Sequence, residues 1–299
     1  MADKPSRGVI APILTPFNDD LTVATDLYVN HARWLFEQGC AAIAPFGTTG
    51  EALSVGIDER IAAIKALIDG GVDPARMIPG TGLTNVADTA RLSRACLDMG
   101  CAAVMTLPPF YFKGVSEEGL YSYFVQLIAA IGDDARIFLY HIPPIAVVGI
   151  PPSLAARLHT DFPRQIIGIK DSSGDFENTR ALLDIDGLIV YPGSELPLIE
   201  ALELGAPGCI SATANLNAAA IAAVIDAFDQ GDIERARSLQ EEVRKFRLAV
   251  QEYAPIPAQK RLLAIASGDE RWANVRPPLT TMPDDTGREL DAALPALRL

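Results

Sequence analysis

The sequence predicts an α/β fold, a (β/α)8 barrel with a C-terminal helical extension, and eight short apolar runs carry this prediction. The runs alternate with helical patterns as far as about residue 230. Each run is continuously apolar instead of alternating with polar residues, which is typical of parallel strands buried on both faces. Eight strand-then-helix units favour a closed barrel over the alternative, an open doubly wound sheet. The runs lie near residues 8–14, 40–45, 77–80, 102–107, 136–140, 166–170, 188–191 and 208–212.

Helical patterns fill the gaps between the runs. Apolar residues recur at helical spacing in the segments 58–69, 85–99 and 116–131. Ser116, followed by two glutamates, is typical of a helix start. Strand and helix patterns therefore alternate as a barrel requires.

The last part of the chain has no strand pattern. After Asn215 only helical patterns follow, at residues 217–228, 232–252, 257–266 and 286–294. No linker, low-complexity segment or long charge run separates them from the rest. We therefore expect a barrel with the active site in residues 1–230 and a helical extension packed on it in residues 231–299.

Composition excludes several kinds of partner. The 299 residues are 49% hydrophobic, which is ample for a large core, and the net charge is −13. This charge disfavours binding to nucleic acid or to an anionic membrane, and no basic run offsets it. No apolar run approaches the roughly 20 residues that cross a bilayer. We also expect no signal peptide at the N-terminus.

No residue pattern indicates a disulfide, a metal or a nucleotide. The four cysteines sit in apolar contexts, which indicates small buried residues in a reducing compartment and a cytoplasmic protein. The three histidines are isolated from one another, so we expect no metal site. Residues 80–82 lack the third glycine of a dinucleotide-binding loop, and no phosphate-binding Gly-Lys-Ser/Thr loop occurs, so we expect no cofactor. These cysteines and histidines are Cys40, Cys96, Cys101, Cys209, His31, His141 and His159.

Lys170 is the residue on which the functional interpretation rests. It ends the apolar run 166–170, at the carboxyl end of a predicted buried strand. Burial can strip water from an ammonium and favour the neutral amine, which attacks carbonyls to form Schiff bases. The other interpretation is a strand-end lysine that reaches into solvent. The first is favoured because the other five lysines lie in a tail, a loop or helical patterns.

Other predicted strands end in groups that complement an amine, and the active sites of barrels lie at these ends. Residues 47–51, Gly-Thr-Thr-Gly-Glu, can bind a carboxylate through N–H groups and hydroxyls, or they form only a tight turn. Tyr140 can carry protons to and from a substrate, or it only lines the barrel. His141 points the opposite way, since side chains alternate along a strand, and is expected to be structural. Gly193 can bring backbone close to a ligand.

Four segments occur in a distinctive order and spacing. They are Gly-Thr-Thr-Gly-Glu at 47–51, Tyr-x-x-Pro at 140–143, Gly-Ile-Lys at 168–170 and Gly-Cys-Ile-Ser at 208–211. Together they make the chain resemble the dihydrodipicolinate synthase / N-acetylneuraminate lyase family of class I aldolases. The resemblance covers essentially the whole chain, and the combination is highly specific although each motif alone is weak.

The resemblance implies a mechanism. Lys170 would form a Schiff base with the keto carbon of pyruvate or another 2-keto acid, and Tyr140 would be the proton-transfer phenol. Thr48 would sit in the proton relay. Members work without metal and are usually homotetramers, built as dimers of dimers, so the same assembly is expected here.

The resemblance also implies how the substrate is held. Thr49 would bind the substrate carboxylate through its hydroxyl and backbone N–H, next to Gly47. Gly193 and the carbonyl of Ile210 would line the pyruvate end. These residues lie at the ends of three different predicted strands.

Two segments bear on the choice of substrate when they are compared with the synthases of this family. Synthases carry an arginine two residues after the proline of the segment that begins at Tyr140, and it grips the carboxylate of the second substrate. Here that position is Ile145, which cannot make a bidentate contact with a carboxylate. Synthases also use a tyrosine from the neighbouring subunit. Tyr111 keeps this phenol, unless a shift of one residue places Phe112 there instead. Lys113 either helps to bind a polar substrate tail or is a solvated loop lysine.

We therefore predict a Schiff-base-forming lyase that cleaves or dehydrates a 2-keto-3-deoxy sugar acid or a related 2-keto acid. One alternative is a 4-hydroxy-tetrahydrodipicolinate synthase, which joins pyruvate to aspartate semialdehyde. Another is a non-catalytic paralogue that binds a keto acid as a sensor. Retention of Lys170 and Tyr140 counts against the sensor, because binding alone needs neither an imine-forming amine nor a proton carrier.

Overall fold

The computed structural model describes residues 7–294 and contains two compact units. The first unit is built from Asp73–Ile210, and the second from Gly8–Val72 together with the chain from Ser211 onward. The division predicted between residues 230 and 231 stays a prediction.

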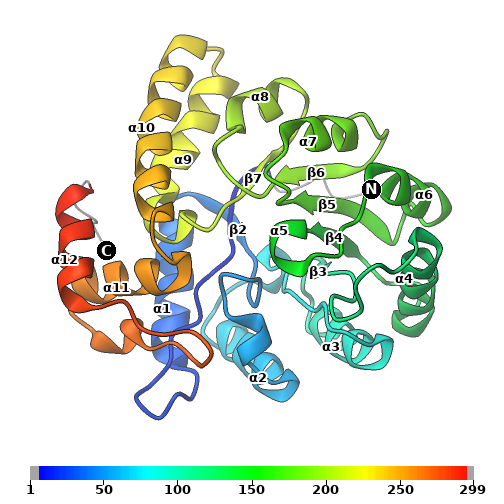
Figure 1. Ribbon diagram of the computed structural model, residues 1–299, viewed down its shortest axis with the longest axis horizontal. Coiled ribbons are helices and arrows are strands. Elements are labelled where there is room, and N and C mark those ends of the chain that lie inside the picture. The colour runs from blue at the N-terminus through cyan, green and yellow to red at the C-terminus, as the bar shows by residue number, and fades with distance from the viewer. Residues whose placement is uncertain (1–6, 295–299) are drawn as a thin grey trace. The chain divides into compact units, whose positions relative to one another are not determined.

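Parallel strands form the sheet of the first unit (Figure 1). They pair in the order of the chain, and every residue of the first two strands is buried. This burial on both faces explains why the apolar runs of the sequence are continuous. The paired strands are β3 (Val104–Thr106), β4 (Ile137–His141), β5 (Ile166–Asp171) and β6 (Ile189–Pro192), and a further strand, β7 (Gly208–Ile210), contacts β6.

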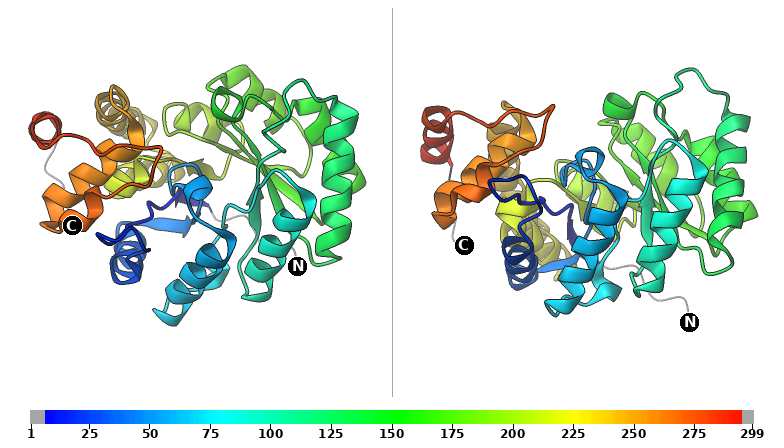
Figure 2. Two further views of the ribbon diagram at one scale, coloured as in Figure 1. Left: turned by 60° about the horizontal axis from the view of Figure 1, so that its bottom comes forward. Right: turned by 90° about the horizontal axis from the view of Figure 1, so that it is seen from below.

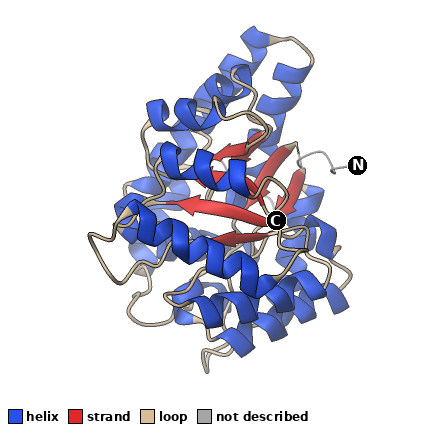
Figure 3. Ribbon diagram, turned by 90° about the vertical axis from the view of Figure 1, so that its right-hand side faces the viewer, coloured by secondary structure: helices blue, strands red, loops and turns tan. Residues whose placement is uncertain are grey.

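Helices follow the strands of the first unit and pack against the sheet, as the blue helices beside red strands in Figure 3 show. The expected helix start at Ser116 is confirmed, because its hydroxyl accepts a hydrogen bond from the N–H of Gly119 at 3.1 Å. The helices predicted at 85–99 and 116–131 agree closely with the structure. The helices are α3 (Val86–Asp98), α4 (Glu117–Ile131), α5 (Pro143–Ala146), α6 (Pro152–Asp161), α7 (Phe176–Leu183) and α8 (Leu198–Glu203).

The strand expected at residues 77–80 is reduced to an isolated bridge. Gly80 pairs in parallel with Met105, whose N–H donates to the carbonyl of Pro79 at 2.8 Å. Pro79 has no N–H of its own, so a regular ladder cannot continue through it. The N–H of Thr81 donates to the carbonyl of Met105 at 2.9 Å, so the expected strand position is occupied by a bridge with two hydrogen bonds and not by a continuous ladder.

The second unit begins with two parallel strands and two helices. Strand β1 (Gly8–Ala11) pairs with β2 (Cys40–Ile43), with Ala11 opposite Ile43. Helix α1 (Thr25–Glu37) joins these strands, and α2 (Ile57–Asp69) follows the turn after β2. The helix predicted at 58–69 is confirmed.

Helices make up the C-terminal part of the second unit, as the sequence predicts. Within residues 7–294 no strand follows Asn215. Figure 2 shows α11 next to α10 and α12, and the three helices contact one another. The helices are α9 (Ala214–Asp229), α10 (Ile233–Gln251), α11 (Pro255–Ser267) and α12 (Asp284–Ala293).

A hydrophobic core holds these helices to the N-terminal segment of the same unit. Leu14 is fully buried in one apolar cluster with residues of the C-terminal helices. They are Phe246 of α10, Leu262 of α11, Trp272 of the short helix after α11, and Leu290 of α12. Burying one such side chain contributes about 1.5–3 kcal/mol. The helices are therefore an integral part of this unit and not a loosely attached tail.

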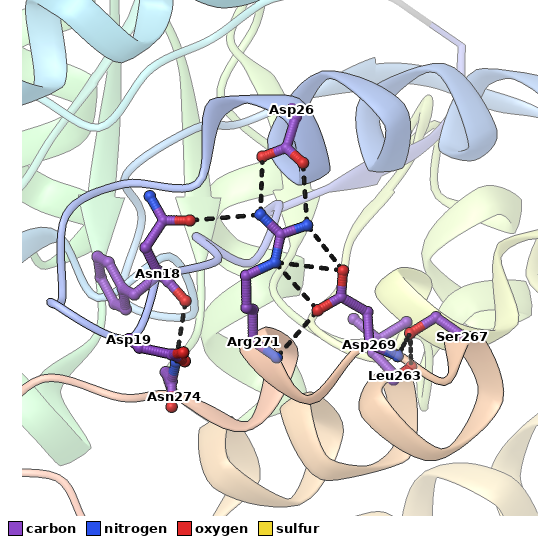
Figure 4. A network of polar contacts seen from close by, with 9 residues as sticks. Asn18, Asp19, Asp26, Leu263, Ser267, Asp269, Arg271 and Asn274 are labelled. Atoms are coloured by element: carbon purple, nitrogen blue, oxygen red, sulfur yellow. Dashed lines mark hydrogen bonds and ion pairs between the residues drawn. The ribbon is translucent and has the colours of Figure 1, made fainter.

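A polar network reinforces the same packing (Figure 4). The guanidinium of Arg271 donates to the carboxylate of Asp26 at 2.9 Å and to that of Asp269 at 2.7 Å. It also donates to the side-chain oxygen of Asn18 at 3.3 Å. Arg271 thus links α1 and the loop before it to the short helix that follows α11.

Two further expectations can be compared with the described residues. No helix within residues 7–294 combines the length and the apolar character that a membrane crossing requires. All four cysteines are buried, as their apolar contexts predict. Their burial fits the packing role assigned to them.

Candidate active site

Lys170 and Tyr140 meet inside the first unit. They are register partners on the neighbouring strands β5 and β4, so their side chains leave the sheet on the same face. The Nζ of Lys170 donates to the phenolic oxygen of Tyr140 at 3.3 Å and lies 4.4 Å from the centre of its ring. Lys170 is 4% exposed and Tyr140 is 3% exposed. The amine therefore lies one residue before the end of a buried strand, close to the expected position, and has a phenol within reach.

Asp171 fixes the end of the strand that carries Lys170. Its buried carboxylate accepts hydrogen bonds from the hydroxyl of Thr179 at 2.6 Å, the amide of Asn178 at 3.0 Å and the N–H of Ser173 at 2.9 Å. Two of these donors lie on α7, so the helix and the strand end are tied together. The sequence reasoning missed this residue, although an aspartate that follows a strand-end lysine, with polar residues a helical turn later, is a usable signal.

His141 has the structural environment that the sequence predicts. Its Nδ1 accepts a hydrogen bond from the N–H of Ile150 at 2.7 Å, and it is 7% exposed. Burial lowers the pKa of His141, and the nearby charge of Asp171 opposes this effect. The imidazole thus braces the segment after α5 as a neutral acceptor.

Gly193 is required by the close approach of two strand ends. Its N–H donates to the carbonyl of Asp171 at 2.6 Å. A Cβ at this position would overlap the hydroxyl of Ser172 and lie 2.9 Å from the carbonyl of Asp171. Ile210 ends β7 and is fully buried. That Gly193 and Ile210 line the substrate stays a prediction.

A loop and the short helix α5 of the first unit expose apolar side chains. Tyr111 and Phe112 are 74% and 69% exposed, with ring centres 5.6 Å apart, and Ile145 is 62% exposed. Lys113 joins the loop to α5, because its Nζ donates to the carbonyl of Phe110 and, at 3.1 Å, to that of Ala146. Lys113 is exposed and lies in a loop, as the second of the two alternatives from the sequence has it, and its amine bonds to backbone carbonyls.

The turn at residues 47–51 belongs to the second unit. Gly47 is buried, and Thr48 and Thr49 are half-buried. The hydroxyl of Thr15 donates to the carbonyl of Gly50 at 2.8 Å, and this bond anchors the turn to the segment after β1. The carboxylate seat predicted for these threonines stays a prediction.

The reactive groups near the end of β5 are not accompanied by a cluster of metal-binding side chains in the described residues. Within residues 7–294, no three His, Cys, Asp or Glu side chains gather in a group that could hold a metal ion. The reactive groups that the first unit does bring together are an amine and a phenol. These are the groups that imine chemistry uses.

Nearly the whole chain is similar in sequence and structure to known proteins. The chain matches the model of the Dihydrodipicolinate synthetase family over residues 5–297. An uncharacterized DapA-like lyase of Chloroflexus aurantiacus is 37% identical over 80% of this chain and 80% of that protein. A 4-hydroxy-tetrahydrodipicolinate synthase of Methanopyrus kandleri is 31% identical over 98% of this chain and 97% of that protein. The crystal structure of dihydrodipicolinate synthase from Agrobacterium tumefaciens matches with a TM-score of 0.87 at 33% identity, covering 96% of this chain and 97% of that one.

Fold and site together define a class I lyase that works through a lysine Schiff base. The chain belongs to the Dihydrodipicolinate synthetase family. The predicted fold, a (β/α)8 barrel with a C-terminal helical extension, is confirmed by the structural match. In a barrel of this kind the ends of the strands carry the chemistry, which is where Lys170 and Tyr140 lie.

Proposed function

We propose that this lyase forms its Schiff base between Lys170 and the keto carbon of a 2-keto acid, and that it cleaves or dehydrates a 2-keto-3-deoxy sugar acid. The observation that carries the proposal is the buried contact of 3.3 Å between the Nζ of Lys170 and the phenol of Tyr140. An amine that is to attack a carbonyl needs to be neutral, and a group beside it has to move protons. In this proposal Lys170 supplies the attacking amine and Tyr140 the group that moves protons.

The chemistry follows from the imine. The Nζ of Lys170 attacks the keto carbon, and the oxygen of that carbon leaves as water once it has been protonated. The protonated imine then withdraws electrons from the neighbouring bond. Cleavage of the C3–C4 bond releases an aldehyde, or loss of the C4 hydroxyl releases water, and an enamine is an intermediate on either route. Tyr140 donates and removes the protons, and such a positioned acid–base group contributes about 10²–10⁴-fold in rate. No cofactor is required.

Six further residues complete the proposal through the family resemblance. Thr48 assists the phenol in the proton relay, and so does Tyr111 of a neighbouring subunit. The exposed positions of Tyr111 and Phe112 leave either ring able to face a second copy. The remaining roles concern the substrate: Thr49 and Gly47 hold its carboxylate, and Gly193 and Ile210 line its pyruvate end.

The substrate class is argued from Ile145. An exposed isoleucine follows the strand that carries Tyr140, where synthases of the family hold an arginine. An alkyl side chain cannot bind the carboxylate of aspartate semialdehyde. A second candidate, 4-hydroxy-tetrahydrodipicolinate synthase, is supported by the relative of that name in Methanopyrus kandleri. The third candidate function is a sensor that binds a keto acid without turning it over.

The assembly and compartment are also proposed. We expect a homotetramer, a dimer of dimers, in the cytoplasm, with no nucleic acid or membrane partner. The exposed rings of Tyr111 and Phe112 support an interface, since large apolar side chains are rarely left in water together. Light scattering on the purified chain of 31.9 kDa tests this expectation, and a monomer at micromolar concentration would contradict it.

Borohydride trapping tests the covalent step. Reduction in the presence of pyruvate should attach a pyruvate-derived group to the peptide that contains Lys170, and the variant Lys170→Met should take up none. Lys65→Met, which removes an exposed lysine, is the matched control and should be trapped like the wild type. Absence of an adduct with pyruvate and with every other keto acid tested would remove the imine mechanism.

A substrate panel tests the rest. Sugar acids of the 2-keto-3-deoxy type are assayed for pyruvate release and for loss of water, beside pyruvate with aspartate semialdehyde. We expect turnover of a sugar acid. Condensation with aspartate semialdehyde at a rate typical of a synthase would replace this proposal by the second candidate. Trapping without any turnover would favour the sensor.

A further inference from the structure

A buried ion pair joins the turn at residues 47–51 to the helical extension, and the proposed mechanism does not use it. The Nζ of Lys260, on α11, donates to a carboxylate oxygen of Glu51, and both side chains are 0% exposed. Lys260 also donates to the carbonyl of Asn274 at 2.7 Å and lies 4.3 Å from the ring centre of Phe17. The ammonium is thus enclosed by a carboxylate, a carbonyl and an aromatic face.

The second oxygen of Glu51 is also held by the extension. It accepts a hydrogen bond from the backbone N–H of Arg276 at 3.0 Å. The guanidinium of Arg276 donates to the carbonyl of Ser54 at 2.8 Å and to the carboxylate of Glu59 at 2.7 Å. The C-terminal segment therefore holds residues 51–59 by a series of bonds to side chains and backbone.

The backbone of this turn is in a conformation that needs such support. Glu51 has a φ of 53° and Phe46 a φ of 56°, in the left-handed region that side chains other than glycine rarely adopt. A Cβ at Gly50 would lie 2.8 Å from the carbonyl of Ile13, so no other residue fits between them. Strained backbone of this kind persists only where its surroundings impose it, and it clusters at functional sites.

Stability alone does not account for a pair of charges in this place. Removal from water disfavours both ions, and well-packed apolar residues of similar volume are often as stabilising. Burial lowers the pKa of Lys260 to about 8, although the charge of Glu51 opposes this effect. The ion pair forms directional hydrogen bonds at defined positions, and a pair of apolar side chains cannot form them.

We propose that Glu51 and Lys260 are positioning residues, which hold the hydroxyls and backbone N–H groups of Thr48 and Thr49 in the arrangement that binds the substrate carboxylate. The inference rests on the proposed function, since it takes these threonines as the carboxylate seat. It gives the helical extension a part in substrate binding. Glu51 and Lys260 themselves need not touch the substrate.

Three variants of the full-length chain and one control test the inference. Glu51→Gln and Lys260→Met each remove one charge, and the double variant Glu51→Leu with Lys260→Met replaces the pair by apolar side chains. Lys65→Met is the control, because it breaks an exposed pair with Asp69 in the same unit. Three quantities are measured: the pyruvate concentration for half-maximal borohydride trapping, the maximal trapped fraction, and amide hydrogen exchange of peptides spanning residues 44–56.

We expect the half-saturating pyruvate concentration to rise about tenfold in all three variants, the equivalent of one charge-assisted hydrogen bond. The maximal trapped fraction should stay unchanged, because the amine that reacts is intact. Exchange in residues 44–56 should become faster in the variants and stay unchanged in Lys65→Met. The double variant keeps the test valid if single variants fold poorly.

Two outcomes overturn the inference and differ from each other. If the folded double variant binds pyruvate like the wild type, the pair has only a structural role, whatever its melting temperature. If the wild type itself gives no pyruvate adduct, the proposed function fails and the positioning role fails with it. The wild-type sample alone distinguishes these cases.

Discussion

The Nζ of Lys170 and the phenolic oxygen of Tyr140 lie 3.3 Å apart as register partners on the adjacent strands β5 and β4. Both residues are buried, and backbone pairing fixes their spacing. A catalytic pair built on strands is held more precisely than one built on loops. The phenol therefore lies within hydrogen-bond reach of the Nζ without any movement of the strands.

Tyr140→Phe should separate proton transfer from imine formation. We expect kcat to fall by about 10²–10⁴-fold, the usual contribution of a positioned acid–base group. Borohydride should still trap pyruvate on Lys170 at equilibrium. The control is Tyr123→Phe, which removes another buried phenol, one that lies 3.0 Å from the hydroxyl of Thr89. Equal losses of kcat in both variants would contradict a specific role for Tyr140.

Asp171→Asn should weaken the fold at the end of β5. The carboxylate accepts three hydrogen bonds, and an amide nitrogen in its place faces at least one of those donors. A buried group left without its partner costs about 2 kcal/mol in the free energy of unfolding. Urea unfolding measures this loss. Asp175→Asn, at the start of α7, is the control and should change little, since Asn and Asp cap helices equally well.

Much of the site could be predicted because it depends on local pattern. The continuous apolar run before Lys170 places that lysine at a strand end, and the barrel rule then places it with Tyr140. Both steps need only short segments of sequence. At residues 77–80 the predicted position pairs with β3 as expected, but only as a bridge, because Pro79 interrupts the ladder.

The residues that support the site could not be predicted in this way. Glu51 and Lys260 are 209 positions apart, and nothing near either residue identifies its partner. Asp171 finds its donors on the following helix only after α7 has packed against the strand end. Apolar periodicity reports burial along one element. It carries no information on which polar groups of different elements bond to one another. These hydrogen bonds and ion pairs support the site.

Ile145→Arg should move the substrate preference toward aspartate semialdehyde. A guanidinium at this position can bind a carboxylate in a bidentate way, which isoleucine cannot. We expect the rate of condensation with pyruvate to rise about tenfold at fixed substrate concentration, the effect of one charge-assisted bond. Val147→Arg is the control, because Val147 is equally exposed (62%) two residues further along. A similar gain in both variants would show only a general effect of positive charge.

His31 should make the stability of the protein depend on pH. Its ring is buried, stacks on Trp34 and lies 3.1 Å from the side-chain oxygen of Asn215. Burial lowers the pKa of His31 from 6.5 to about 4, and the bond with Asn215 opposes this only in part. Between pH 4 and pH 6.5, His31 therefore binds a proton in the unfolded chain but not in the folded chain. Stability from His31 is therefore complete above pH 6.5 and is lost as pH falls toward 4, by up to about 3 kcal/mol.

Urea unfolding at pH 7.5 and pH 4.5 measures this contribution as the difference between the wild type and His31→Gln, which cannot titrate. The variant should be the less stable protein at pH 7.5, because Gln fills the site poorly, and should lose less stability on acidification. Trp34→Phe, which alters the ring stacked on His31 but keeps the imidazole, should retain the wild-type dependence on pH. An equal loss on acidification in His31→Gln and in the wild type would assign the pH dependence to carboxylates elsewhere in the chain.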